Sequence, residues 1–326
     1  MTIFEKLTKN ILKHHSQGYA IYYYNNGYIL EQTNGKELDE ISDEISFDTN
    51  FRLASVSKQF IAFSIVNLIK ENKISYDTNI LTIFNDLPDY FKNITIKHLL
   101  NHTSGIYDYE DMEHKEDDPQ IIDADILDFL KTTNDTYFEA GTKYKYSNTA
   151  YILLGLIVEQ VSKCPINEYI ETNVFKQAGM EKSKVNIQGI TKIENRAYGH
   201  LLDNENNLYV KDQYWCSATI GDGGLYSSVN DLKKWCKYLV NSANFQDMKI
   251  PNYVNELEYN FYGLGIRTIE VDGNLIHYHC GDTIGTNTLL LFSSDLNLCL
   301  IFLTNLGGID TEIMKNNLIE LIKGKN

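Results

Sequence analysis

The spacing of hydrophobic and polar residues predicts both helices and strands in the first quarter of the chain. Residues 1–15 place apolar side chains at the intervals of an amphipathic helix. Residues 19–24 and 28–32 are rich in Tyr and Ile, and the Asn26-Gly27 pair between them indicates a β-hairpin. Residues 55–71 return to a helical period. This part therefore predicts a helix, a hairpin and a longer helix.

The middle of the chain, from about residue 77 to 225, predicts mostly helices. Residues 149–160 are nearly all apolar, which is typical of a buried helix. Thr95 can cap a short helix, and Pro165 can begin another. Residues 109–118 are acidic and show no period, so a surface loop is expected there.

The last third of the chain returns to strand patterns and ends in a helix. Strands are predicted at residues 264–271, 275–279, 286–292 and 296–304, and a helix at residues 310–323. Short turns join the consecutive strands, and strands joined in this way form an antiparallel sheet.

Together these patterns predict an α+β fold, in which helices from both chain ends flank an antiparallel sheet and a mostly helical lobe is inserted between them. The α/β lobe takes about residues 1–80 and 225–326, and the helical lobe about residues 81–224. The 326 residues are expected to form one domain that needs no disulfide or metal for a stable core.

Composition and charge narrow the functional classes. The formal net charge of −15 argues against binding to nucleic acid or anionic lipid, which requires clustered Lys and Arg. The five cysteines are scattered and contain no C-x-x-C pair, which argues against a disulfide framework or a zinc site. The chain shows neither a signal peptide nor an apolar run long enough to span a membrane. A cytoplasmic protein is expected, unless a leader was removed.

A candidate nucleophile stands at the start of the second predicted helix, in Ser55-Val56-Ser57-Lys58. A serine hydroxyl is a weak nucleophile that needs a nearby base, and side chains three positions apart on a helix share one face. Lys58 is therefore placed to activate Ser55, and the helix N-terminus favours a developing anion. Taken alone, the tetrapeptide favours a serine cap followed by a solvated lysine.

Tyr146-Ser147-Asn148 is a second short motif with chemistry. Tyr146 could act as a base or relay a proton, although its free pKa of about 10 requires neighbouring cations such as Lys58. Asn148 could hold Lys58 and a substrate carbonyl. A packed tyrosine before a capped helix would explain the same residues.

The third motif, His279-Cys280-Gly281, ends a predicted strand. An exposed strand edge can supply a backbone N–H to an oxyanion hole, and Gly281 would let substrate approach closely. His277 and His279 share a face of the strand, as metal ligands would, but no third ligand accompanies them at a telling spacing.

In this order, Ser-x-x-Lys, Tyr-x-Asn and His-x-Gly, the chain resembles the serine β-lactamase and penicillin-binding-protein superfamily, specifically its class C-like branch, which also includes esterases and D-amino-acid peptidases. Further similar segments are residues 51–58, residues 99–105 with the family's "LLxHTSG" pattern, residues 138–149 with Ala140 in place of the usual proline, and the glycine-rich residues 221–227. His102 and Thr103 are expected to be structural. The resemblance covers about residues 18–305.

The resemblance implies a β-lactamase/transpeptidase-like fold and a role for each matching residue. Ser55 would be acylated, and Lys58 and Tyr146 would share the proton transfers. Asn148 would position the substrate, and the backbone N–H groups of Ser55 and Asp282 would form the oxyanion hole. No cofactor and no metal are implied.

The chain departs from the family at the third motif, where β-lactamases and penicillin-binding proteins generally have Lys-Thr-Gly. His279 carries less charge than lysine at neutral pH, and Cys280 lacks the hydroxyl that helps bind a β-lactam carboxylate. Family esterases and peptidases often have histidine here. His279, Gly281 and Asp282 are expected to line the substrate site. Asp282 or Asp222 could pair with a cationic substrate group, but side chains that point away from the site are the favoured interpretation of these carboxylates.

The resemblance therefore favours a hydrolase that forms an acyl-enzyme on Ser55 and takes a small ester, amide or peptide substrate. A β-lactamase or D-Ala carboxypeptidase is an alternative, and so is a catalytically silent binding or assembly member of the family. The sequence leaves the oligomeric state open.

Overall fold

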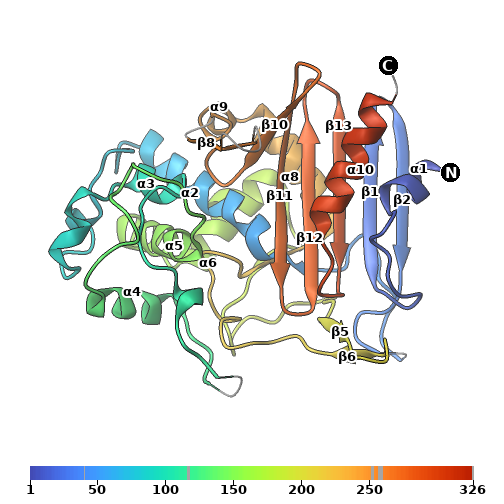
Figure 1. Cartoon of the computed structure of the whole chain (residues 1–326), viewed down its shortest axis with the longest axis horizontal. Helices are drawn as coiled ribbons and strands as arrows, with labels where there is room; N and C mark the ends of the chain where they lie inside the picture. Colours follow the sequence, from blue (N-terminus) through green and yellow to red (C-terminus); the bar gives the residue numbers. More distant parts are fainter. Residues whose placement is uncertain (40, 116–117, 251–252, 256–259, 325–326) are drawn as a thin grey trace.

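The structure, a computed structural model, describes residues 1–39, 41–115, 118–250, 253–255 and 260–324. Its largest element is an eight-stranded antiparallel sheet in the order β2-β1-β13-β12-β11-β10-β9-β8 (Figure 1). The strands are β1 (Tyr19–Asn25), β2 (Tyr28–Asn34), β8 (Tyr253–Asn255), β9 (Asn260–Tyr262), β10 (Arg267–Val271), β11 (Asn274–Thr283), β12 (Thr286–Ser293) and β13 (Leu298–Thr304). Strands from both chain ends therefore meet where β1 pairs with β13, as expected.

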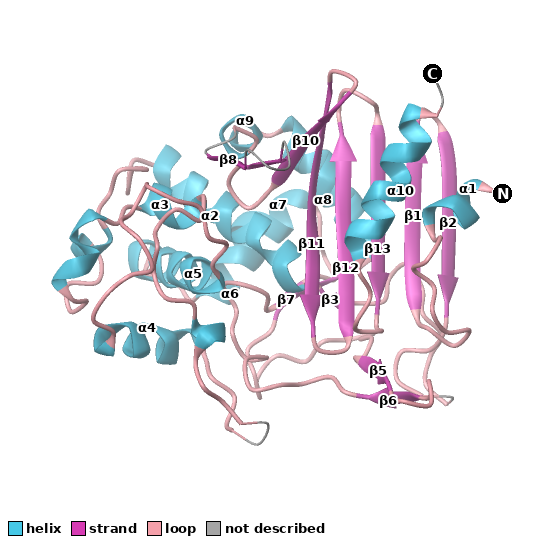
Figure 2. Cartoon of the chain, in the orientation of Figure 1, coloured by secondary structure: helices cyan, strands magenta, loops and turns pink. Residues whose placement is uncertain are grey.

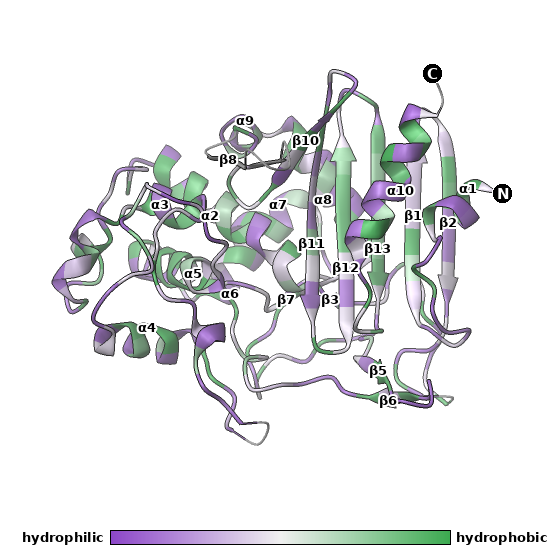
Figure 3. Ribbon diagram, viewed as in Figure 1, coloured by the Kyte–Doolittle hydropathy of each residue, from purple (hydrophilic) through white to green (hydrophobic). Residues whose placement is uncertain are grey.

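Helices cover both faces of this sheet (Figure 2). The covering helices are α1 (Ile3–Leu7) and α10 (Thr311–Lys323) on one face, and α2 (Lys58–Lys70), α8 (Val229–Asn241) and α9 (Ala243–Met248) on the other. Because alternate strand residues point to opposite faces, Leu291 packs in the cluster of α10, whereas Leu290 packs in the cluster of α2 and α8. The hydropathy colouring shows the apolar central strands β12 and β13 between these layers (Figure 3).

The inserted region lies beside the sheet and contains the helices α3 (Ile96–Leu100), α4 (Asp123–Thr132), α5 (Asn148–Ser162), α6 (Ile166–Ile170) and α7 (Lys176–Ala178). Short 3₁₀ turns lie at Ile80–Thr82, Asp89–Asn93 and Tyr109–Asp111, and a π-helical turn at Glu171–Phe175. The middle of α5 is fully buried, as its apolar sequence predicts.

The second half of the inserted region differs from the prediction. Residues 179–224 form short strands and loops, with β4 (Lys184–Val185), β5 (His200–Leu202) and β6 (Leu208–Val210). β5 and β6 pair as a hairpin around a turn in which Asn206 has a left-handed φ of 64°. Many polar turn residues here favour local hydrogen bonds over a helical period, so the prediction of helices up to residue 224 was wrong.

Two further elements correct the sequence-based expectations. The first helix ends at Leu7 rather than near residue 15, and Asn10 adopts a left-handed φ of 64°. Residues 109–118 are not wholly a surface loop, because Tyr109 is buried and donates a hydrogen bond to Asp222 at 2.7 Å. An aromatic side chain at the start of the acidic segment therefore packs inward.

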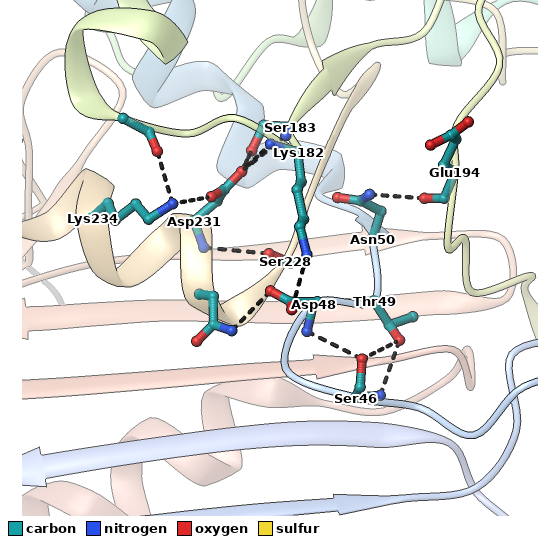
Figure 4. A network of polar contacts seen from close by, with 12 residues as sticks. Ser46, Asp48, Thr49, Asn50, Lys182, Ser183, Glu194, Ser228, Asp231 and Lys234 are labelled. Atoms are coloured by element: carbon teal, nitrogen blue, oxygen red, sulfur yellow. Dashed lines mark hydrogen bonds and ion pairs between the residues drawn. The ribbon is translucent and has the colours of Figure 1, made fainter.

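Polar contacts anchor the chain just before the candidate nucleophile (Figure 4). Asp231 of α8 accepts hydrogen bonds from the backbone N–H groups of Lys182 (2.8 Å) and Ser183 (2.9 Å), and Lys182 pairs with Asp48 at 2.9 Å. The next strand, β3 (Phe51–Arg52), pairs with β7 (Leu225–Ser227). These contacts fix where the chain enters the site.

In the part of the chain that the structure describes, no single helix is long and apolar enough to cross a bilayer. One bent pair, α5 with Ile166–Ala178, meets the length and composition criteria only when its two halves are taken together, and they meet at 83°.

Candidate active site

Ser55 lies in the 3₁₀ turn Ala54–Ser57, and α2 begins only at Lys58, so the predicted α-helix starts three residues late. Side chains three positions apart in a 3₁₀ turn eclipse each other. Lys58 Nζ accordingly lies 3.0 Å from Ser55 Oγ. Ala54 has a left-handed φ of 47°. Such a conformation is uncommon for a residue with a Cβ and is often found at functional sites.

Lys58 is fully buried and is held by acceptors from three segments of the chain. Besides Ser55, Nζ donates to Asn148 Oδ1 at 2.7 Å and to the backbone carbonyl of Asp222 at 2.8 Å. Asn148 opens α5, and Asp222 belongs to the glycine-rich turn before β7. The structure thus brings the first and second sequence motifs together around one amino group.

Tyr146 stands at the same place, with its ring centroid 5.1 Å from Lys58 Nζ and 5.5 Å from the guanidinium carbon of Arg267. Its hydroxyl is buried and has no hydrogen-bond partner among the described residues. A buried hydroxyl is normally paired. An unpaired one beside a nucleophile and its lysine suits proton transfer to a bound substrate.

His102 contacts the segment that carries Tyr146. Its ring lies 4.3 Å from the ring of Tyr146, and its Nδ1 accepts a hydrogen bond from the backbone N–H of Ser147 at 3.1 Å. Burial lowers the pKa of His102 well below its ordinary value, so the ring is neutral. These contacts hold the segment that carries Tyr146, in line with a structural role.

The edge of β11 borders the turn Ala54–Ser57, which carries the candidate nucleophile and is called the nucleophile turn below. β10 pairs with β11 only as far as Tyr278, so β11 continues past its partner from His279 to Thr283. A Cβ at Gly281 would collide with the backbone carbonyl of Leu53 and with Thr288 Oγ1. Gly281 is therefore needed for the close approach of strand and nucleophile turn, rather than for the approach of substrate, as the sequence suggested.

His279 is buried, and both ring nitrogens have protein partners. Nδ1 donates to the backbone carbonyl of Cys280 at 2.6 Å, and Nε2 lies 3.2 Å from the hydroxyl of Tyr262. Burial, with Arg267 and Lys58 nearby, lowers the pKa of His279 well below its ordinary value. His279 is thus a neutral part of the site wall, and no nitrogen is left over for a substrate.

The side chain of Cys280 lies outside the site, contrary to the expectation from the sequence. It points to α10 on the opposite face of the sheet, where its Sγ lies 3.5 Å from Glu312 Oε1. Adjacent strand residues point to opposite faces. The missing hydroxyl at this position therefore does not affect the cleft.

Both carboxylates that the sequence suggested for cation binding have a protein partner. Asp222 is buried and accepts from Tyr109, while the exposed Asp282 accepts from Asn287 Nδ2 at 2.9 Å. Glu110 was missed. It keeps an exposed surface, but crowding removes part of its hydration and raises its pKa to about 7, with Asp108 and Asp222 adding to the rise.

Glu110 is coupled to the same cluster, because Lys58 and the side chain of Asn148 oppose this rise in pKa. Sequence reasoning missed Glu110 because it lies in an acidic segment that shows no hydrophobic period. Arg267, the cation beside Tyr146, lacked any motif as well. Both became visible only when the fold brought distant segments together.

The metal interpretation gains no support from the described residues, which contain no group of three or more His, Cys, Asp or Glu side chains that could hold an ion. His277 contacts Thr268 Oγ1 at 2.9 Å, and burial lowers the pKa of His277 to about 4. This histidine is part of the packing between β10 and β11.

Comparison with known proteins agrees with this geometry. The model of the family described as Beta-lactamase matches residues 4–322. The chain belongs to the β-lactamase family. The predicted family is therefore confirmed, and so is the hydrolase class at the level of that family.

A curated relative, a penicillin-binding protein of Bacillus subtilis (strain 168), is 29% identical over 318 residues, which is 91% of this chain and 66% of the relative. The chain thus spans just under two thirds of that protein.

Solved structures confirm the predicted fold class. A penicillin-binding protein from Bacillus halodurans superposes with a TM-score of 0.82 and 26% identity, over 93% of this chain and 96% of that one. A D-amino acid amidase from Ochrobactrum anthropi SV3 gives a TM-score of 0.81 and 21% identity, over 99% of both chains.

Proposed function

We propose that this chain is a serine amidase or esterase that forms an acyl-enzyme on Ser55 and takes small acyl donors with a free amine, such as D-amino-acid amides. The observation that carries the proposal is the contact of Lys58 Nζ with Ser55 Oγ at 3.0 Å, with Asn148 and Asp222 as its other acceptors.

The contacts support the following reaction. Ser55 Oγ attacks the substrate carbonyl, and its proton passes to the Lys58–Tyr146 pair. The tetrahedral intermediate expels the amine or alcohol, which takes a proton from the same pair. Water then cleaves the acyl ester and releases the acid. The backbone N–H groups of Ser55 and Asp282 are predicted to donate to the oxyanion of this intermediate, and this part of the reaction stays a prediction.

The test is acylation followed by peptide mapping. Purified protein is incubated with D-phenylalanine amide and with p-nitrophenyl acetate, and quenched samples are analysed by mass spectrometry. An acyl mass on the Ser55 peptide, with release of product, is expected for the wild type and not for Ser55→Ala. A protein that takes up neither the acyl group nor a fluorophosphonate would be a silent family member.

Glu110 supports the preference for a free amine. Lys58 and Asn148 are near enough to Glu110 to lower its pKa, and we place the substrate amine beside this carboxyl. A charge-assisted hydrogen bond is worth about 1.5–3 kcal/mol, which is roughly ten- to a hundred-fold in kcat/KM at about 1.4 kcal/mol per decade. The net charge of −15 adds a weaker attraction that salt screens.

A matched pair of substrates tests this preference. The free amine should be turned over faster than its N-acetyl derivative, and Glu110→Gln should remove most of the difference. Asp282→Asn serves as the control, because that carboxylate is bound to Asn287. Equal kcat/KM for both substrates in the wild type would contradict the assignment.

A second candidate, a D-Ala carboxypeptidase, is favoured by Arg267. The contacts described for its guanidinium are with the rings of Tyr146 and Tyr262, at 5.5 and 5.6 Å. A substrate carboxylate could pair with it there. Cleavage of a peptide ending in D-Ala-D-Ala, compared with its C-terminal amide, decides between the candidates. A strong preference for the free carboxylate that is lost in Arg267→Gln would favour the carboxypeptidase.

A further inference from the structure

We propose that Asp123 is a positioning residue for the Ser55–Lys58 pair, that it acts through the backbone of residues 220–222, and that its ionisation sets the acid limit of Ser55 reactivity. The inference rests on the proposed acyl-enzyme chemistry at Ser55. It adds a carboxylate that lies in a different segment from the sequence motifs.

The link between Asp123 and the site is the glycine-rich turn. The carbonyl of Asp222 is one of the three acceptors that hold Lys58 Nζ. Two residues before Asp222, the backbone N–H of Ile220 donates to Asp123 Oδ1 at 2.7 Å. The next backbone N–H, that of Gly221, donates to Asp123 Oδ2 at 3.0 Å. The carboxylate thus holds two peptide units of the same turn, with one peptide unit between them and the carbonyl that accepts from Lys58.

Glycine at position 221 lets the turn pack directly against α5. A Cβ at Gly221 would collide with the backbone of Tyr151 in α5, and Gly155 of α5 lies against Gly221 in turn. The only side-chain acceptor described for the N–H groups of Ile220 and Gly221 is Asp123. Close packing brings the turn to α5, and the carboxylate then fixes its orientation.

Both contacts favour the ionised form of Asp123. Each oxygen accepts from a backbone N–H, and protonation would convert one of them into a hydroxyl, which donates a proton and is the weaker acceptor. Asp123 is the first residue of α4 and is only 8% exposed. Helix N-termini favour an anion, but burial opposes ionisation.

Burial raises the pKa of Asp123 to about 7. The titratable groups that face it, Asp222 on the turn and Glu159 on α5, raise it further, while the N–H groups of Ile220 and Gly221 lower it. Because the folded pKa is raised, the contribution of Asp123 to stability is full below its ordinary pKa and is lost as pH rises through about 7. Reactivity should change in the opposite direction, since the ionised form holds the turn.

The experiment measures the second-order rate of Ser55 labelling by a fluorophosphonate from about pH 5 to 9. The wild-type rate should fall about tenfold per pH unit below an inflection near 7, as expected for one essential ionisation. Asp123→Asn should label at least tenfold more slowly at pH 8 and lose the inflection. Asp123→Glu, which keeps an ionisable group, should keep an inflection.

Two variants exclude other causes. Asp125→Asn removes a carboxylate of the same helix that caps Ile122 N–H at 2.9 Å, so it should weaken the helix start and leave the wild-type profile unchanged. Glu110→Gln removes the other carboxyl whose pKa is near 7 and should leave the inflection in place. An inflection that persists in Asp123→Asn, or that vanishes in Glu110→Gln instead, overturns the inference.

Labelling decides this inference, and ester or amide turnover decides the proposed function. Wild-type protein that labels at Ser55 but releases no product would reject the function alone. If Asp123→Asn does not fold, Asp123→Ser, which keeps one acceptor and no carboxyl, replaces it with the same expected loss of the inflection.

Discussion

At the scale of single residues, the site depends on one amino group with three acceptors. Among the described residues, the hydrogen-bond partners of Lys58 are a hydroxyl, an amide and a backbone carbonyl, and none of them is a carboxylate. The position of this amino group is thus fixed by uncharged groups from three segments of the chain.

Substitution of the reacting residues should show that they act as one unit. Ser55→Ala should lower kcat by several orders of magnitude and leave the melting temperature within a few degrees of the wild type, because a half-buried hydroxyl contributes little to packing. Lys58→Ala and Tyr146→Phe should each be severely impaired. The double variant should lose far less than the product of the two single losses, as measured by steady-state kinetics; multiplicative losses would contradict a shared proton path.

The third motif makes a separate prediction about β-lactams. His279 is neutral and its nitrogens are occupied, so nitrocefin turnover should be slow compared with the best ester or amide. His279→Lys would restore a charge at the strand edge, worth roughly ten- to a hundred-fold in acylation rate at about 1.5–3 kcal/mol. Stopped-flow acylation by nitrocefin measures both. Cys280→Ser is the neighbouring control, because that side chain lies on the other face of the sheet. Fast nitrocefin turnover by the wild type would refute the argument.

At the scale of elements, the nucleophile turn and β11 fit each other without an intervening side chain. Thr288 Oγ1 of β12 donates to the carbonyl of Leu53 at 2.9 Å, and Gly281 leaves room for this contact. The distance between the strand edge and Ser55 is thus set by backbone and one hydroxyl. We expect this interface to align Ser55 with the proposed oxyanion donor on Asp282.

Gly281→Ala should separate these two elements. The added methyl would displace β11 or the nucleophile turn, and overpacking of this kind costs about 1–3 kcal/mol of stability. The loss of activity should be at least tenfold and should exceed that expected from stability alone. Chemical denaturation and ester kinetics measure the two effects; Thr283→Ala, at the end of the same strand, is the control. Unchanged kinetics would show that the contact does not align the site.

At the scale of the whole molecule, one sheet separates two apolar layers, and only one of them packs against the elements of the candidate active site. The layer of α2 and α8 contains Phe60 and Trp235 and lies on the side of His279, whereas the layer of α1 and α10 lies on the other. Trp235 also donates to Gln59 of the nucleophile helix at 3.0 Å. The first layer therefore supports both the fold and the position of Ser55.

Adjacent positions on β12 allow a matched test of this division. Leu290 pairs with His279 and faces α2, and Leu291 faces α10; both are fully buried. Leu290→Ala and Leu291→Ala should each cost about 2–5 kcal/mol of stability. Only Leu290→Ala should also lower kcat at a temperature where both variants are folded. Equal kinetic losses would mean that the two layers are not functionally distinct.

The sequence by itself determined the order of elements and the chemical centre. An Asn-Gly turn and periodic apolar residues are local signals, and they predicted the antiparallel sheet and the buried helix α5. The group of Ser55, Lys58, Tyr146 and Asn148 was predicted from the resemblance that the three short motifs carry together. Local signals also have limits. The residues 179–224 and the short first helix were misjudged because left-handed turns and side-chain hydrogen bonds ended the helices.

Tertiary structure alone decided which atoms meet. That Cys280 faces α10, that His279 is neutral, and that Gly281 serves the approach of two elements follow from the pleat and packing of the sheet. The positions of Glu110, Arg267 and Asp123 depend on segments far apart in the chain, and hydration lost on burial raises the pKa of the two carboxyls. Such non-local contacts leave no periodic mark in the sequence, because each one is made by residues whose neighbours in the chain do not take part.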